Sequence, residues 1–275
     1  MNNEEWNYEV TPISTEYFKQ RSFGIVFDVF NTMQMSEDEL IKDYVEIIGI
    51  DELYESLKYH YDIVYSSILI KNYELLKDYF IWKYSVCISR NINVDCFLIE
   101  YEFWKKSVLN HLYASHGSEI NMIYSYLILN HEDLKNKAFN TKNIKINSKY
   151  QDLFDELLVC LLTGQKNEFY TLMKNDLIKF DNNVFLFIEE LIDPLMYKVG
   201  QMWQLNELSV AKEHLATSLI DEIINDFIKE NFLDDGSKPI AITSTVGDES
   251  HNLGIKIVGK FIESNGFSVK NLSSK

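Results

Sequence analysis

The chain has 275 residues, of which 46% are hydrophobic, enough for packed cores in about two domains. It carries 42 acidic and 26 basic residues, a formal net charge of −16, so its field repels phosphate backbones and anionic lipid surfaces. We therefore expect no direct binding to nucleic acid.

The cysteines and the apolar runs indicate where the chain resides. Cys87, Cys96 and Cys160 lie in apolar patterns without CxxC spacing, so we expect buried thiols in a reducing compartment. The N-terminus lacks a secretory signal, and charge interrupts every apolar run before the roughly 18 residues that a membrane span needs. These features predict a cytoplasmic location.

Residues 14–134 have apolar positions at three- and four-residue spacing, which predicts an all-α domain of five or six helices. Ser36, followed three residues later by Glu39, is a candidate capping box. The other helices are expected at residues 51–70, 73–89, 94–113 and 119–129.

Single residues within these helices carry little functional signal. Four histidines have no partner at i+3 or i+4 and are expected on polar faces: His60, His111, His116 and His131. Trp82 and Trp104 are expected in the helical core.

Residues 136–149 are rich in Asn and Lys and predict a linker. A second helical set follows with short connections, which favours a four-helix bundle. Its helices are expected at residues 150–162, 166–172, 183–203 and 210–230.

The helical spacing of apolar residues ends after residue 237. Two β-branched runs, 239–246 and 267–272, flank a helix at 251–264, which predicts a β-α-β unit. Two strands are too few for a parallel sheet covered on both faces, so we expect a truncated chain.

The predicted fold is therefore mainly α with a C-terminal α/β part. The expected domains are an all-α signalling or dimerisation domain at 1–140, a four-helix cap at 147–235, and part of a Rossmann-like domain at 238–275.

The first chemical signal lies in the third connection of the bundle. Trp203 ends one predicted helix, and Glu213 and His214 begin the next after nine intervening residues. A helical hairpin places this indole, carboxylate and imidazole at one end of the bundle. Each part alone is common. A Trp at a helix end is usually a core residue, and an acidic residue at a helix start is stabilised by the helix dipole.

The second signal lies between the first strand and the next helix, where open α/β sheets bind ligands. The residues there are Glu249, His251 and Gly254. A carboxylate two residues before a histidine can fix the ring's tautomer and leave the other nitrogen basic for a metal. A glycine at the third position allows a ligand to approach the helix backbone. Alone, this segment could equally be a capped helix start with a satisfied His.

Together the two signals resemble the cobalamin-dependent photoreceptor and transcription-regulator family, whose signature is Trp, nine residues, then Glu-His. Residues 161–169 and 192–200 are also similar to the first and third helices of that family's cap. The second signal resembles the Asp-x-His-x-x-Gly motif of cobalamin domains, with Glu249 in place of Asp.

The resemblance implies a regulatory protein, not an enzyme, with adenosylcobalamin held between the cap and the Rossmann-like domain. It implies that Trp203 packs against the adenosyl group, with Glu213 and His214 beside it, and that His251 is the lower cobalt ligand. Light would break the cobalt–carbon bond and release the cap. Because no DNA-reading helix-turn-helix is recognised, we expect signalling through a protein partner or self-association.

Two alternatives stay open. A corrinoid carrier of a methyltransferase system shares this layout, although Trp with Glu-His suits a larger upper ligand. A degenerate scaffold that no longer binds cobalamin is the other, since the later motifs that hold the nucleotide tail are absent from these residues. Gln204 is a further departure, because DNA-binding members often carry His directly after the Trp.

Overall fold

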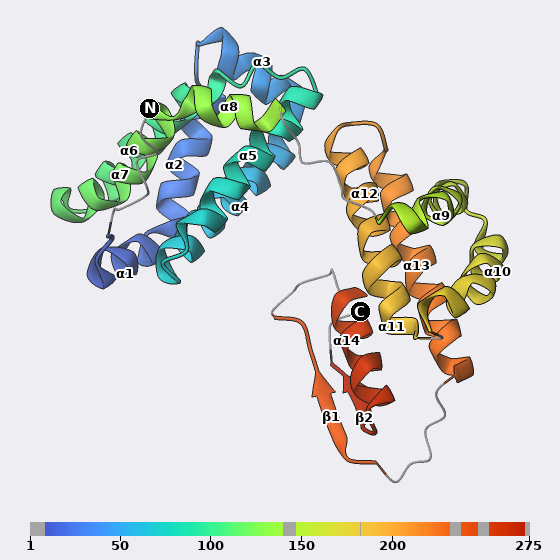
Figure 1. Cartoon of the computed structure of the whole chain (residues 1–275). Helices are drawn as coiled ribbons and strands as arrows, with labels where there is room; N and C mark the ends of the chain where they lie inside the picture. The colour runs from blue at the N-terminus through green and yellow to red at the C-terminus, as the bar shows by residue number, and fades with distance from the viewer. Residues whose placement is uncertain (1–8, 140–146, 182, 232–237, 247–252, 273–275) are drawn as a thin grey trace. The chain divides into compact units, whose positions relative to one another are not determined.

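The computed structural model describes residues 9–139, 147–181, 183–231, 238–246 and 253–272. The chain divides into two compact units, Met1–Lys142 and Asn143–Lys275, and each is described by itself (Figure 1). The division lies within the predicted linker at residues 136–149, although helix already extends to Phe139. The fold is mainly α.

Unit 1 is all-α. Its described residues form eight helices: α1 (Pro12–Gln20), α2 (Ser22–Gln34), α3 (Glu39–Ile48), α4 (Ile50–Leu69), α5 (Tyr73–Ser89), α6 (Cys96–His111), α7 (Ala114–Leu129) and α8 (His131–Phe139). The expectation of five or six helices is wrong because two breaks contain neither Gly nor Pro. Arg21 alone separates α1 from α2, and Asn130 alone separates α7 from α8.

The start of α3 differs from the predicted capping box. Asp38, not Ser36, is the N-cap, and its carboxylate accepts the Leu40 N–H at 2.9 Å. Ser36 instead accepts the Asp38 N–H at 3.3 Å through its hydroxyl. Asp and Ser are both strong caps, and the one adjacent to the first helical residue takes the position here.

The core of unit 1 is predominantly aromatic. Phe18, Tyr101, Trp104 and Tyr124 have no exposed surface, whereas Trp82 is more than a third exposed. The expectation of a core position is thus right for Trp104 and wrong for Trp82. All three cysteines of the chain are buried and free, as the sequence predicted.

Unit 2 begins with the four expected helices. They are α9 (Gln151–Thr163), α10 (Lys166–Asp176), the continuous run α11 (Val184–Phe187), η3 (Ile188–Ile192) and α12 (Asp193–Gln204), and finally α13 (Val210–Asn231). Two short 3₁₀ turns, η1 (Ser148–Tyr150) and η2 (Leu177–Phe180), complete the set. The third helix is interrupted by the π-helical turn η3, because Pro194 has no N–H to donate to the carbonyl of Glu190.

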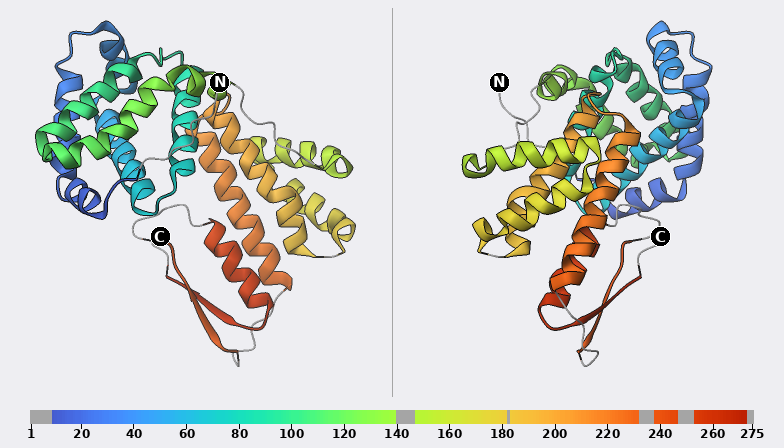
Figure 2. Two further views of the ribbon diagram at one scale, coloured as in Figure 1. Left: turned by 60° about the vertical axis from the view of Figure 1, so that its left-hand side comes forward. Right: turned by 90° about the vertical axis from the view of Figure 1, so that its right-hand side faces the viewer.

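A β-α-β unit completes unit 2 and lies beside the helices (Figure 2). β1 (Ile240–Thr243) pairs in parallel with β2 (Ser268–Asn271), and α14 (Leu253–Ser264) connects them. Gly259 of α14 lies against the sheet, where an added Cβ would come within 3.3 Å of Val269. One face of the sheet is therefore covered by α14.

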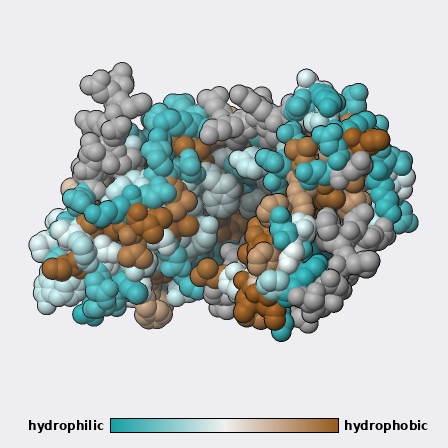
Figure 3. All heavy atoms as spheres, turned by 60° about the horizontal axis from the view of Figure 1, so that its bottom comes forward, coloured by the Kyte–Doolittle hydropathy of each residue, from teal (hydrophilic) through white to brown (hydrophobic). Residues whose placement is uncertain are grey.

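The opposite face of the sheet exposes side chains of β1, with Ile240 and Ile242 both more than half exposed. Figure 3 shows separate apolar patches among hydrophilic residues on the side of the chain that it draws. Among the helices that the structure describes, none has both the length and the apolar character needed to cross a membrane.

Candidate functional site

The connection between α12 and α13 sets the position of the predicted site residues. Asn206 adopts a left-handed conformation (φ 58°), and the Glu207 N–H donates to the Met202 carbonyl at 2.8 Å, so the chain reverses within five residues. Leu208 is buried and anchors the turn. Trp203, which is half-buried against the core of unit 2, therefore lies at the same end of the hairpin as the first turn of α13.

Glu213 and His214 interact with each other and with Thr217. The Thr217 hydroxyl donates to Glu213 Oε1 at 2.9 Å, and Glu213 Oε2 lies 3.1 Å from His214 Nδ1. The Glu213 side chain is 26% exposed, and that of His214 is 71% exposed. Both side chains thus reach an accessible surface.

Helix α14 packs against the same side of α13, further along that helix. The Lys256 ammonium forms an ion pair with Asp221 at 2.6 Å, and Leu253 and Ile257 pack against the core of unit 2. One turn or more later, Phe261 contacts Phe185 edge-on, with ring centroids 5.0 Å apart. Phe185 lies at the start of the α11–α12 run, and Trp203 lies near its end. The N-terminal end of α14 is therefore the end nearer Trp203.

We call Val210, His214, Thr217 and Asp221 the α13 stripe, since their spacing of three or four residues places them on one side of the helix. Asp221 meets α14, whereas Val210 and His214 are exposed. His214 lies seven residues before Asp221, which is about 10 Å along the helix axis. Among the residues that the structure describes, the stripe therefore continues uncovered beyond the start of α14, toward the end of the hairpin that carries Trp203.

Gly254 lies in the first turn of α14 and is exposed. An added Cβ there would meet nothing within 4 Å, so the backbone is open to a ligand. Glu249 and His251 lie outside the described residues, and their predicted roles stay predictions.

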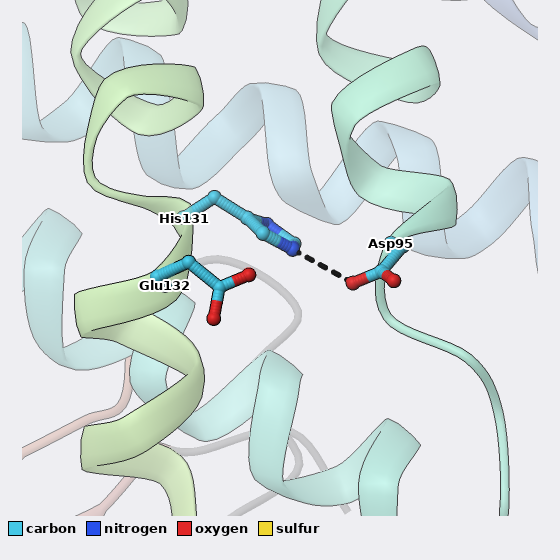
Figure 4. A group of neighbouring side chains, drawn as sticks. All are labelled: Asp95, His131 and Glu132. Atoms are coloured by element: carbon cyan, nitrogen blue, oxygen red, sulfur yellow. Dashed lines mark hydrogen bonds and ion pairs between the residues drawn. The ribbon is translucent and has the colours of Figure 1, made fainter.

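Unit 1 contains a second group of chemically capable side chains, Asp95, His131 and Glu132. One ligand atom of each lies within 4.8 Å of the others, and Figure 4 shows the His131 ring directed at Asp95. The His131 ring is held on both nitrogens, by the Tyr84 hydroxyl at 2.7 Å and by Asp95 at 3.0 Å. The Lys135 ammonium reaches the same Asp95 oxygen at 2.8 Å.

These contacts satisfy the group internally. The hydrogen bonds from Lys135 and His131 lower the pKa of Asp95, and a cation is already present in the lysine. We therefore assign the group to the structure of unit 1. The expectation that His131 lies on a polar face is wrong, because the residue is 3% exposed and its ring joins α8 to α5 and to Asp95 at the start of α6.

His60 also departs from expectation, since it has no exposed surface. Its ring stacks on Trp104 at 4.7 Å and lies 3.7 Å from a carboxylate oxygen of Glu100. Glu100 is fully buried and accepts the Lys83 ammonium at 2.7 and 3.1 Å. The sequence did not predict this buried group of His60, Glu100 and Lys83. The signal that could have indicated it was Lys83, a lysine within the apolar run of α5.

Comparison with known proteins bears on unit 2. Residues 153–225 match the sequence model of the family described as B12 binding domain. The match runs from α9 into α13 and includes Trp203, Glu213 and His214. No curated protein matches the chain. A B12 binding domain is therefore present at residues 153–225, and it supports cobalamin as the cofactor.

Proposed function

We propose that the chain is a sensory protein, not an enzyme, that binds adenosylcobalamin, responds to light and regulates transcription through a protein partner or self-association. The observation that carries this proposal is the uncovered part of the α13 stripe. Val210 and His214 stay exposed within the B12 binding domain, on the side of α13 where α14 begins.

The residues present fit a large planar ligand with an upper group. The Trp203 indole offers an apolar surface, and Glu213 with His214 offers hydrogen-bonding groups at the same end of the hairpin. Gly254 leaves the start of α14 open to a close approach. When bound, the cofactor would supply the photochemistry, while the protein supplies packing and ligation.

The roles of the second motif follow from the same proposal. His251 would hold the cobalt, and Glu249 would orient its ring by accepting a hydrogen bond from the other ring nitrogen. In His251→Ala, the spectrum of the bound cofactor should change to that of a form without imidazole ligation. An unchanged spectrum would contradict the assignment of His251 as a cobalt ligand.

The test of light sensing compares two cofactors in darkness. Trp203→Ala should weaken adenosylcobalamin more than hydroxocobalamin, because only the former has an upper group for the indole to cover. Loss of this contact costs ~1–3 kcal/mol, or one to two orders of magnitude in affinity. Trp82→Ala in unit 1 is the matched control and should leave both affinities unchanged.

Illumination provides the second readout. The visible spectrum of the wild-type complex with adenosylcobalamin should change on exposure to light. An equal loss for both cofactors in Trp203→Ala, together with a light-insensitive spectrum, would favour a corrinoid carrier instead. Absence of cobalamin binding by the full chain would favour a scaffold.

Signalling through protein contacts has its own test. A formal net charge of −16 opposes contact with phosphate backbones, so mobility-shift assays at low salt should detect no binding to duplex DNA. Tight, sequence-selective retention of DNA by this chain would contradict the proposal.

A further inference from the structure

Helix α2 of unit 1 is apolar on two opposite faces. Its core face consists of four buried residues, Ile25, Val26, Val29 and Met33. Its outer face carries four uncharged side chains at three- or four-residue spacing, which we call the α2 stripe: Phe23, Phe27, Phe30 and Gln34. A helix that is apolar on every side is normally covered on every side, so the outer face is a candidate contact surface.

The aromatic part of the α2 stripe is accessible. Phe23 is 69% exposed and Phe27 is 44% exposed, and their rings stack with centroids 5.6 Å apart. Phe30 is half-buried beside them on the helix. Asp28, the one charged residue of α2, lies off the stripe and accepts a hydrogen bond from the Asn110 amide of α6 at 3.2 Å. Figure 2 shows α2, in blue, at the edge of unit 1 in both views.

Charges at the two ends of α2 indicate what covers the stripe. Lys19 and Arg21 are exposed at the N-terminal end, where α1 ends and α2 begins. Glu37, Asp38 and Glu39 are exposed just after the C-terminal end. The outer face of α2 is therefore basic at one end, uncharged along the stripe and acidic at the other end.

This pattern is complementary to itself in an antiparallel pair. A two-fold axis through the middle of α2 places the basic end of each copy on the acidic end of the other. Phe27 then lies opposite Phe30 of the second copy, and Phe23 lies opposite Gln34 of the second copy. Because the net charge of −16 makes two copies repel each other in general, a surface with matched ends is where they can meet.

We propose that the α2 stripe is a homodimer contact, in which α2 packs antiparallel on α2 of a second copy of this chain. Contact along a helix of 13 residues, about 20 Å long, buries less than a standard interface of ~1,600 Å². The dimer is therefore weak, with a Kd on the order of 10–100 μM. Its use in signalling rests on the proposed function, whereas the contact itself does not.

The contact is tested by sedimentation equilibrium of the full chain, without cofactor, at about 1–300 μM, a range chosen to span the expected Kd. The wild type should dimerise. Phe27→Glu places a carboxylate beside the dimer axis and should weaken association at least about tenfold. Tyr59→Glu on α4 is the matched control, because it removes a 53% exposed aromatic side chain outside the stripe and makes the same change in net charge. It should associate like the wild type.

Charge exchange separates paired ends from general repulsion. Arg21→Glu makes the net charge −18, and Glu37→Arg makes it −14. General repulsion predicts that Glu37→Arg associates more tightly than the wild type. Paired ends predict that each single variant associates about fivefold more weakly, and that the double variant, with net charge −16 again, returns to the wild-type value.

Unchanged thermal unfolding establishes that the variants are folded. A monomeric wild type over this concentration range, equal association of wild type and Phe27→Glu, or tighter association of Glu37→Arg would overturn the antiparallel contact. The stripe would then be covered within one chain or by a different partner. Cobalamin titration of the same samples tests the proposed function separately, and its failure would leave the dimer result unchanged.

Discussion

The buried His60 in unit 1 makes stability depend on pH in a defined direction. Neither ring nitrogen has a hydrogen-bond partner among the described residues, and the side chain has no exposed surface. Burial, followed by the positive charge of Lys83, lowers the pKa of His60 well below its ordinary value. Glu100 lies 3.7 Å away, but its charge is already balanced by Lys83, so burial decides the direction.

The size of the effect follows from the linkage between proton binding and folding stability. Below the ordinary histidine pKa of about 6.5, His60 binds a proton in the unfolded chain but stays neutral in the folded chain. The free energy of unfolding therefore falls as the pH falls, by up to about 1.4 kcal/mol per pH unit. Between about pH 7.5 and 5.5, His60 alone should remove about 1.4 kcal/mol from the stability of unit 1.

The test compares wild type with His60→Leu, which has a similar volume and cannot be protonated. Urea unfolding is followed through methyl NMR signals of unit 1, so that unit 2 does not contribute. The variant should lose about 1.4 kcal/mol less than wild type across the same pH interval, because all other titrating groups are shared. Equal losses in the two proteins would refute the argument that a neutral, unpaired imidazole is buried here.

Three further predictions concern packing and the open backbone. Lys83→Met should destabilise unit 1 by ~3–5 kcal/mol, because Glu100 keeps a buried charge without its partner, and adding Glu100→Gln should restore part of this in urea unfolding. Gly259→Val should lower the stability of unit 2 by ~1–3 kcal/mol in thermal unfolding, since the side chain would meet Val269. Gly254→Ala should leave that stability unchanged or raise it by up to ~1 kcal/mol, because nothing lies within 4 Å and Ala has the higher helix propensity, yet it should weaken cobalamin binding in a dark titration.

The helices were predictable where local signals coincide with the tertiary structure. Asn72 caps α5 by accepting the Leu75 N–H at 3.2 Å, and the predicted and observed helix have the same bounds, Tyr73–Ser89. The end of one helix near Trp203 and the start of the next at Val210 were also predicted. Caps and apolar spacing act within a few residues, so the sequence displays them directly.

The buried polar group of unit 1 was not predictable in this way. Lys83 and Glu100 lie 17 residues apart on different helices, and His60 lies on a third. Whether these side chains face one another depends on how α4, α5 and α6 pack, which no local pattern contains. A lysine in an apolar run indicates a buried charge, but it does not identify the carboxylate that balances it.

The first turns of α13 show why the candidate site also needed the structure. An acid there stabilises the positive end of the helix dipole, so Glu213 can be explained by helix formation alone. Ala216, Ile220 and Ile223 turn into the core, and a polar opposite side is ordinary for an amphipathic helix. Two observations go beyond this: Thr217 donates to the Glu213 carboxylate, and α14 leaves the stripe uncovered at His214. Neither feature is needed to form the helix. A ligand placed between α13 and the start of α14 would contact both the exposed part of the stripe and the Glu213 carboxylate that Thr217 holds.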